Sequence, residues 1–233
     1  MRRLLAIVAC VVMGAGLWAQ TARSADEWLT AMFNAYSRPQ PAQQKATVSV
    51  VMTTARNPQG EVIQRLVYTY TLEAPAKLNL TVQNTLTNTT TRVQSDGQRL
   101  TVQAPNHQPQ EVLIANSGLA LLEQLVAQDV VPTYDMVFVF GGKTKQDEFR
   151  KQVSQLKIAS EDEKQVVITG KIRNERNRDD DLQLVLDKAT ARLRAFQVTT
   201  RVKIEGADGA FTLLMEFEAP RAEPAETVAP TKP

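Results

Sequence analysis

The single histidine of the chain, His107, is the first residue to test for catalysis, because imidazole is the usual general base near neutral pH. It lies in Pro105-Asn106-His107-Gln108-Pro109, a polar segment typical of a turn between strands. A nucleophilic mechanism also needs a hydroxyl or thiol within reach of the base and a third group that orients it. The sequence offers no such arrangement, so we interpret His107 as a surface histidine and expect the protein not to be an enzyme.

Three consecutive acids, Asp179-Asp180-Asp181, are the next candidates, since carboxylates bind hard cations. Calcium takes about six to eight oxygens from a shaped loop, and no spaced acidic loop accompanies these residues. Because Arg173, Arg176 and Arg178 precede them, the acids favour a solvated, charge-compensated hairpin tip. Gly141-Gly142 lacks the downstream glycine and lysine of a phosphate-binding loop, and we predict a hinge or turn there. The sequence therefore predicts neither a metal nor a cofactor.

The N-terminus has the layout of a secretory signal peptide. Met1-Arg2-Arg3 is basic, residues 4–17 form an uncharged apolar run, and Ala22 and Ser24 occupy the small-residue positions before a cut after Ser24. The apolar run is shorter than the about 20 residues of a relaxed membrane span. We therefore predict a signal peptide over residues 1–24 and export to the periplasm, with an uncleaved signal anchor as the alternative.

Cys10 is the only cysteine, and Ile7-Val8-Ala9-Cys10 resembles a lipobox, in which bacteria lipidate a cysteine. Only residues 4–9 would form the apolar core before it, and the hydrophobic run continues past it, so we expect no lipoprotein through Cys10. Beyond residue 24 there is no cysteine, which excludes a disulfide and a thiol nucleophile in the mature chain.

The net charge argues against a nucleic-acid partner. The whole chain has 27 Lys+Arg and 25 Asp+Glu. Residues 1–24 contain Arg2, Arg3, Arg23 and no acid, which leaves 24 against 25, a net charge near −1. The mature chain therefore lacks the basic excess that phosphate backbones require.

The elements that could position a site begin with a helix. Ser24 and Glu27 have the spacing of a capping box, and apolar residues from Trp28 to Tyr36 recur at helical spacing. Alternating apolar and polar residues then predict antiparallel strands, punctuated by turns such as Asn57-Pro58-Gln59-Gly60 and Asp96-Gly97. We predict a single domain over residues 25–219 and a disordered Pro/Ala-rich tail over residues 220–233.

The middle of the chain interrupts this pattern. Asn116-Ser117 can cap a helix that continues to Val126, and Met136-Val137-Phe138-Val139-Phe140 is the most hydrophobic stretch after the signal peptide. A large antiparallel sheet must cover one face, and the N-terminal helix and this central helical insertion are the available cover. The fold class is therefore mostly β, of the α+β kind.

The order of these parts resembles the LolA-like superfamily of periplasmic lipoprotein and lipid carriers, and resembles still more an uncharacterised periplasmic family of that fold. The matching motifs are Ala74-Pro75-Ala76-Lys77-Leu78, Ser95-Asp96-Gly97-Gln98-Arg99-Leu100 and Leu184-Val185-Leu186-Asp187-Lys188-Ala189-Thr190. The resemblance implies a half-open, strongly curved antiparallel sheet whose concave apolar face is partly closed by helices and binds acyl chains. The internal arginine of the lipoprotein carriers has no single counterpart here, since Arg65 and Arg92 are both candidates.

We expect the ligand-binding residues of such a protein to be apolar lid and cavity residues, because methionine and aromatic side chains pack adaptably. The candidates are Trp28, Met32, Phe33, Tyr36, Met136, Phe138 and Phe140. The alternative is that they simply fill the core. The predicted function is a periplasmic carrier or binding protein for a lipid, a lipidated protein or another apolar ligand. The competing hypothesis is a protein-interaction or sensor module with a filled core, whose partner is a periplasmic or membrane-associated protein.

Overall fold

The structure, a computed structural model, describes residues 23–37, 43–204 and 206–218. The predicted signal peptide up to residue 22, Cys10 and the predicted tail over residues 220–233 lie outside the described residues. Within the described residues no helix is long and apolar enough to cross a membrane.

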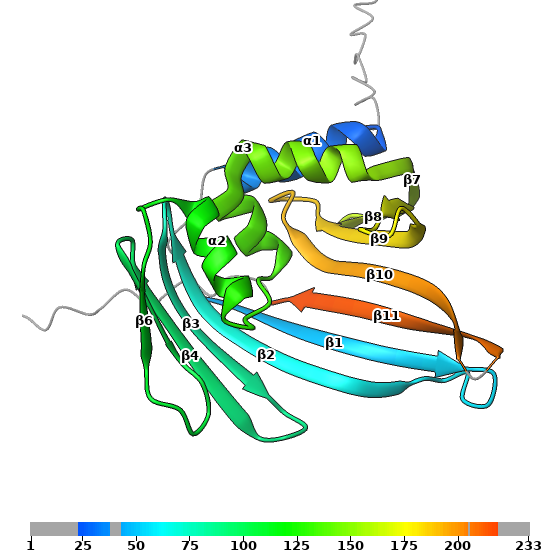
Figure 1. Ribbon diagram of the computed structural model, residues 1–233. Helices are drawn as coiled ribbons and strands as arrows, with labels where there is room; N and C mark the ends of the chain where they lie inside the picture. The colour runs from blue at the N-terminus through cyan, green and yellow to red at the C-terminus, as the bar shows by residue number, and fades with distance from the viewer. Residues whose placement is uncertain (1–22, 38–42, 205, 219–233) are drawn as a thin grey trace, which may run out of the picture.

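One antiparallel sheet of eleven strands dominates the described part of the chain (Figure 1). Its spatial order is β6-β5-β4-β3-β2-β1-β11-β10-β9-β8-β7, so the first and last strands are neighbours at its centre. The strands of the first half are β1 (Gln44–Thr54), β2 (Glu61–Glu73), β3 (Lys77–Asn84), β4 (Thr89–Asp96), β5 (Arg99–Gln103) and β6 (Gln110–Leu113). Those of the second half are β7 (Val153–Glu161), β8 (Gln165–Arg173), β9 (Asp179–Asp187), β10 (Leu193–Ile204) and β11 (Ala207–Phe217).

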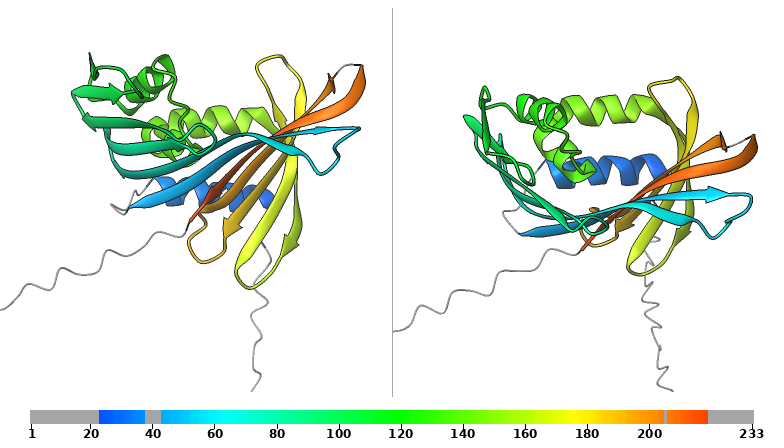
Figure 2. Two further views of the ribbon diagram at one scale, coloured as in Figure 1. Left: turned by 90° about the horizontal axis from the view of Figure 1, so that it is seen from below. Right: turned by 60° about the horizontal axis from the view of Figure 1, so that its bottom comes forward.

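The sheet is strongly curved and open, and the three helices of the described residues lie on its concave side (Figure 2). Helix α1 (Ala25–Tyr36) precedes the sheet, while α2 (Gly118–Ala127) and α3 (Tyr134–Gln152) connect the edge strand β6 to the edge strand β7. The predicted mostly-β half-barrel with an N-terminal helix and a central helical lid is therefore confirmed.

Local sequence signals set the helix boundaries as expected. Ser24 caps α1, and its capping box with Glu27 is complete in both directions. Ser117 caps α2 through a hydrogen bond from the Ala120 amide. The predicted hinge or turn at Gly141-Gly142 is a break inside α3, and a second helical segment follows it. Gly142 has φ 49° and ψ −142° and kinks α3, as expected for a residue without a Cβ.

Close approach between the two lid helices also needs a glycine. A Cβ on Gly118 would lie 2.1 Å from the carbonyl oxygen of Phe140 and 2.7 Å from that of Pro75. Both contacts are to backbone, which cannot move aside as a side-chain tip can. Gly118 therefore allows the start of α2 to pack directly on α3 and on the turn before β3.

The acidic triplet is placed differently from the prediction. Asp179, Asp180 and Asp181 begin strand β9 rather than forming a hairpin tip. Asp180 is buried and accepts a hydrogen bond from Asn174, while Asp181 accepts hydrogen bonds from Lys171 and Arg201. The loop proper is residues 174–178, because the alternation of Leu182, Leu184 and Leu186 extends upstream through Asp180 on the core face.

Candidate functional site

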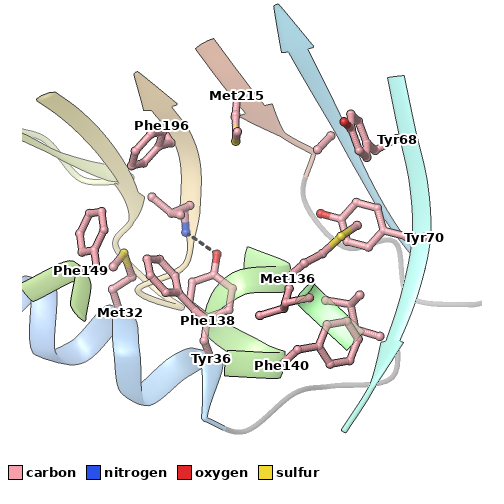
Figure 3. Close-up of a cluster of buried hydrophobic side chains, with 14 of the residues drawn as sticks. Met32, Tyr36, Tyr68, Tyr70, Met136, Phe138, Phe140, Phe149, Phe196 and Met215 are labelled. Atoms are coloured by element: carbon pink, nitrogen blue, oxygen red, sulfur yellow. Dashed lines mark hydrogen bonds between the residues drawn. The ribbon is translucent and has the colours of Figure 1, made fainter. Parts of the chain in front are cut away.

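The seven residues predicted to line a ligand site are all buried in one packed cluster. Figure 3 shows Met32, Tyr36, Met136, Phe138 and Phe140 of this cluster. The most exposed of them, Phe33, retains 7% of its surface, and Met32 and Met136 retain none. They come from α1 and α3, the elements that the sequence indicated. The structure brings them together as core, so their contact with a ligand stays a prediction.

Phe138 is the centre of this cluster. Its ring centroid lies 5.3 Å from that of Phe33, 5.3 Å from that of Phe149 and 5.7 Å from that of Tyr36. Rings at these distances, largely edge to face, are mutually stabilising beyond the area they bury. The lid is therefore held to α1 by close aromatic packing.

The concave face of the sheet becomes progressively less covered along its central strands. Val48, Met215 and Phe196 are directly opposite one another on β1, β11 and β10, and are almost fully buried. The ring of Tyr134 stacks on Phe196 at 3.7 Å, so the first turn of α3 covers this row.

The next positions along the same strands are open. Val50, Leu213 and Val198 form the following row and are only half buried. Beyond them, Phe211 is opposite Met52 and keeps 36% of its surface exposed. These strand ends extend past the helices in both views of Figure 2. We call this surface the distal floor, formed by Val50, Met52, Val198, Val202, Phe211 and Leu213.

The distal floor was missed from the sequence although its signal was present. Strands β1, β10 and β11 are 11, 12 and 11 residues long, and apolar residues recur on their concave face as far as Met52, Val202 and Phe211, interrupted on β10 by Thr200. A helix rises about 1.5 Å per residue and a strand about 3.4 Å. The 12 residues of α1 therefore cover only about half the length of such a strand, and the comparison of these lengths predicts an uncovered end.

Two tyrosines of β2 hold the connection between α2 and α3 to the sheet. The hydroxyl of Tyr68 donates to the carbonyl of Val131 at 3.0 Å, and that of Tyr70 donates to a carboxylate oxygen of Asp135 at 2.5 Å. The hydroxyl of Thr133 donates to the other oxygen of the same carboxylate. The lid is therefore fixed at its start by polar contacts as well as by packing.

Asp135 is an acid placed inside the core. Burial raises its pKa above the ordinary 3.8, and the hydrogen bonds from Thr133 and Tyr70 oppose this shift only in part. Burial also raises the pKa of Tyr68 to about 12, so its hydroxyl remains a donor.

Replacement of Asp135 by asparagine is expected to remove one pH-dependent contribution to stability. Because the folded-state pKa is raised, the folded protein binds more protons than the unfolded chain between pH 3.8 and that raised value. The free energy of unfolding of the wild type, relative to Asp135→Asn, should therefore rise as the pH falls through this window. Urea unfolding of both proteins from about pH 7 to about pH 4 measures the difference, and a pH-independent difference would contradict the assignment.

A separate pocket of about 950 Å³ opens at the C-terminal end of α1. Ala31, Ala35, Leu193 and Phe217 give it apolar walls, and charged side chains of the β9–β10 turn surround them. The guanidinium of Arg192 donates to the carbonyl of Ala35 at the end of α1, where the helix has no basic residue of its own. The concave face is thus accessible at both ends of the packed cluster.

The two candidates for an internal arginine are both on the wrong face. Arg65 is opposite Ser49 on β1, and Arg92 precedes the buried Val93 on β4. Both side chains are exposed on the outer face. Neither can act inside the half-barrel, and the contacts that fix the lid come from Tyr68 and Tyr70 instead.

Comparison with known proteins gives likenesses of structure alone. A scan of protein-family models and a search of curated proteins found no match. Among solved structures, a LolA superfamily protein from Nitrosomonas europaea is 13% identical with a TM-score of 0.30, over 89% of this chain and 98% of its own. A DUF1329 family protein from Desulfovibrio piger is 9% identical with a TM-score of 0.32, over 87% and 95%.

A chain of the Pseudomonas aeruginosa MucA/MucB complex is 16% identical with a TM-score of 0.35, over 85% of this chain and 59% of its own. The LolA superfamily, which the order of motifs in the sequence resembles, is thus among the proteins found. Because these TM-scores are low, the function of this chain is inferred from its own geometry.

Proposed function

We propose that this protein is a periplasmic binding or carrier protein whose apolar ligand, such as the acyl chain of a lipid or of a lipidated protein, lies on the distal floor. The observation that carries the proposal is the loss of cover along the central strands. The side chains of Val48, Met215 and Phe196 are almost fully buried. In the row directly beyond them, the side chains of Val50, Leu213 and Val198 are only half buried.

The distal floor has the chemistry that an acyl chain requires. Its six side chains are apolar, and Val198 and Leu213 also pack against the core, so the surface is continuous with the interior. From Val198 to Val202 it runs about 14 Å along β10 at the usual rise of an extended strand, with Thr200 between them, opposite Phe211. Each methylene buried on such a surface contributes about 0.8 kcal/mol, so partial burial of a chain is already favourable.

The packed cluster has a different role in this proposal from the one the sequence indicated. Phe138 and its neighbours hold α1 and α3 together and close the inner end of the floor. Their burial leaves no surface for a ligand in this arrangement. The ligand would instead lie against the outer edge of this cluster, where Leu213 and Val198 meet Met215 and Phe196.

Native mass spectrometry of the mature protein, purified from the periplasm without detergent, tests the proposal. We expect an additional mass that organic solvent removes and that extracts as a lipid. A protein without bound mass that also fails to bind an added C16 fatty acid would contradict the proposal. In that case the filled-core alternative, an interaction module for another protein, would become the better explanation.

A further inference from the structure

A second pocket lies on the outer face of the sheet, on the opposite side from the helices. It has a volume of about 470 Å³ and spans β7, β8, β9 and β10. Register places Lys171 opposite Asp181 and Asp181 opposite Thr199, all on the same face. The flanking residues Ile172 and Leu182 point to the core. The walls of this outer pocket are therefore polar, unlike the distal floor.

The outer pocket has an excess of positive charge. Lys171 and Arg201 both donate to Asp181, at 2.5 Å and 3.0 Å, and the hydrogen bond from Lys171 holds the pKa of Asp181 below its ordinary value. The third cation of the lining, Lys157, has no carboxylate partner among the residues that the structure describes. Three cations thus face one anion, and an anionic ligand would balance them.

The backbone of β7 is irregular where it borders the pocket. Its register with β8 shifts between Ser154 and Lys157, and Gln155 within this bulge has φ 54°. A glutamine rarely adopts this conformation, and such strained residues gather at functional sites. Both Gln155 and Lys157 line the pocket as a result.

The uncharged side chains that line the outer pocket can form hydrogen bonds with the hydroxyls of a ligand. The side chains of Gln183, Gln197 and Thr199 provide amide and hydroxyl donors and acceptors. The hydroxyl of Thr169 is buried and has no hydrogen-bond partner in the described part of the chain. A polar group that is buried without a partner is costly.

From these features we infer that the outer pocket binds an anionic saccharide, a sugar that carries a carboxylate or a phosphate. The anionic group pairs with Lys157 and with the Lys171–Arg201 pair, while the sugar hydroxyls exchange hydrogen bonds with the glutamine and threonine side chains. Leu182 is the one large aliphatic residue among those that line the pocket, and it is only 3% exposed, so the pocket lacks the apolar surface of the distal floor.

Calorimetric titration of the mature protein with glucuronic acid, glucose 6-phosphate, glucose and inorganic phosphate tests the inference. We expect the two anionic sugars to bind more tightly than both glucose and phosphate. The substitution Lys157→Gln should weaken their binding about tenfold. The matched control is Lys164→Gln, an exposed lysine in the β7–β8 turn that does not line the pocket, and it should change nothing.

Each other outcome contradicts the inference. Equal binding of glucose shows that charge is irrelevant, and binding of phosphate alone shows a simple anion site. Equal effects of Lys157→Gln and Lys164→Gln show binding elsewhere. The outer pocket is independent of the proposed apolar site, since Leu213→Asp alters the opposite face and should leave saccharide binding intact.

Discussion

Leu213→Asp is expected to weaken binding of a C16 fatty acid by about 10- to 100-fold, because Leu213 lies in the middle row of the distal floor. Burial of a leucine side chain by a ligand contributes about 1.5 to 3 kcal/mol, and the new carboxylate must also lose water when the chain binds. Native mass spectrometry with increasing fatty acid measures the bound fraction of each variant.

The adjacent residue provides a closely matched control. Leu214 is also a half-buried leucine of β11, but it is on the outer face, opposite Ser49 and Gln197. Leu214→Asp introduces the same charge one position away and should leave fatty-acid binding unchanged. Equal losses in both variants would place the ligand elsewhere.

Thermal unfolding checks that each variant is folded. If Leu213→Asp fails to fold, Phe211→Asp makes the same test at a position that is already 36% exposed.

Phe138→Ala is expected to lower the free energy of unfolding by about 3 to 5 kcal/mol, which is the usual cost of removing a buried phenylalanine. Phe138 is 1% exposed and its ring meets those of Phe33, Tyr36, Tyr134 and Phe149. The substitution leaves a cavity between α1 and α3 that these rings cannot fill together. Urea unfolding measures the change, with Val126→Ala, at a 61% exposed site on α2, as the control.

Phe138→Ala also separates the two roles that an apolar residue could have. If Phe138 serves the core and not the ligand, the variant should bind fatty acid with unchanged affinity wherever it remains folded. A loss of affinity larger than threefold without a loss of stability would return Phe138 to the binding surface. An aspartate at Phe138 or Met136 would not make this distinction, since a buried charge there is expected to unfold the domain.

The sequence predicted the elements well because their signals are local. The capping box of Ser24 and Glu27, the turn at residues 57–60 and the alternation of Leu182, Leu184 and Leu186 each depend on neighbours in the chain. Local signals of this kind also predicted the buried stripe of α1.

The sequence could not distinguish the apolar side chains that are buried beneath the helices from those that remain accessible. Met215 and Leu213 have the same alternation on the same strand, yet only Met215 lies beneath the helices. That difference depends on where α3 crosses the sheet, which is a long-range property. The outer pocket could not be predicted either. Lys157, Lys171 and Arg201 come together only through the register of four strands, which is also a long-range property.

The pairing of β1 with β11 has a consequence for biogenesis. Residue 46 faces residue 217, so the centre of the sheet joins the beginning of the domain to its end. Contacts between such distant positions carry a large loop-closure entropy and make folding slow. Because the chain is made from its N-terminus, β1 is complete well before β11, and its edge toward β11 stays unpaired until the rest of the domain has been made. Until then this edge can pair with other chains, and this interval is when the chain is most exposed to aggregation and to assistance by chaperones.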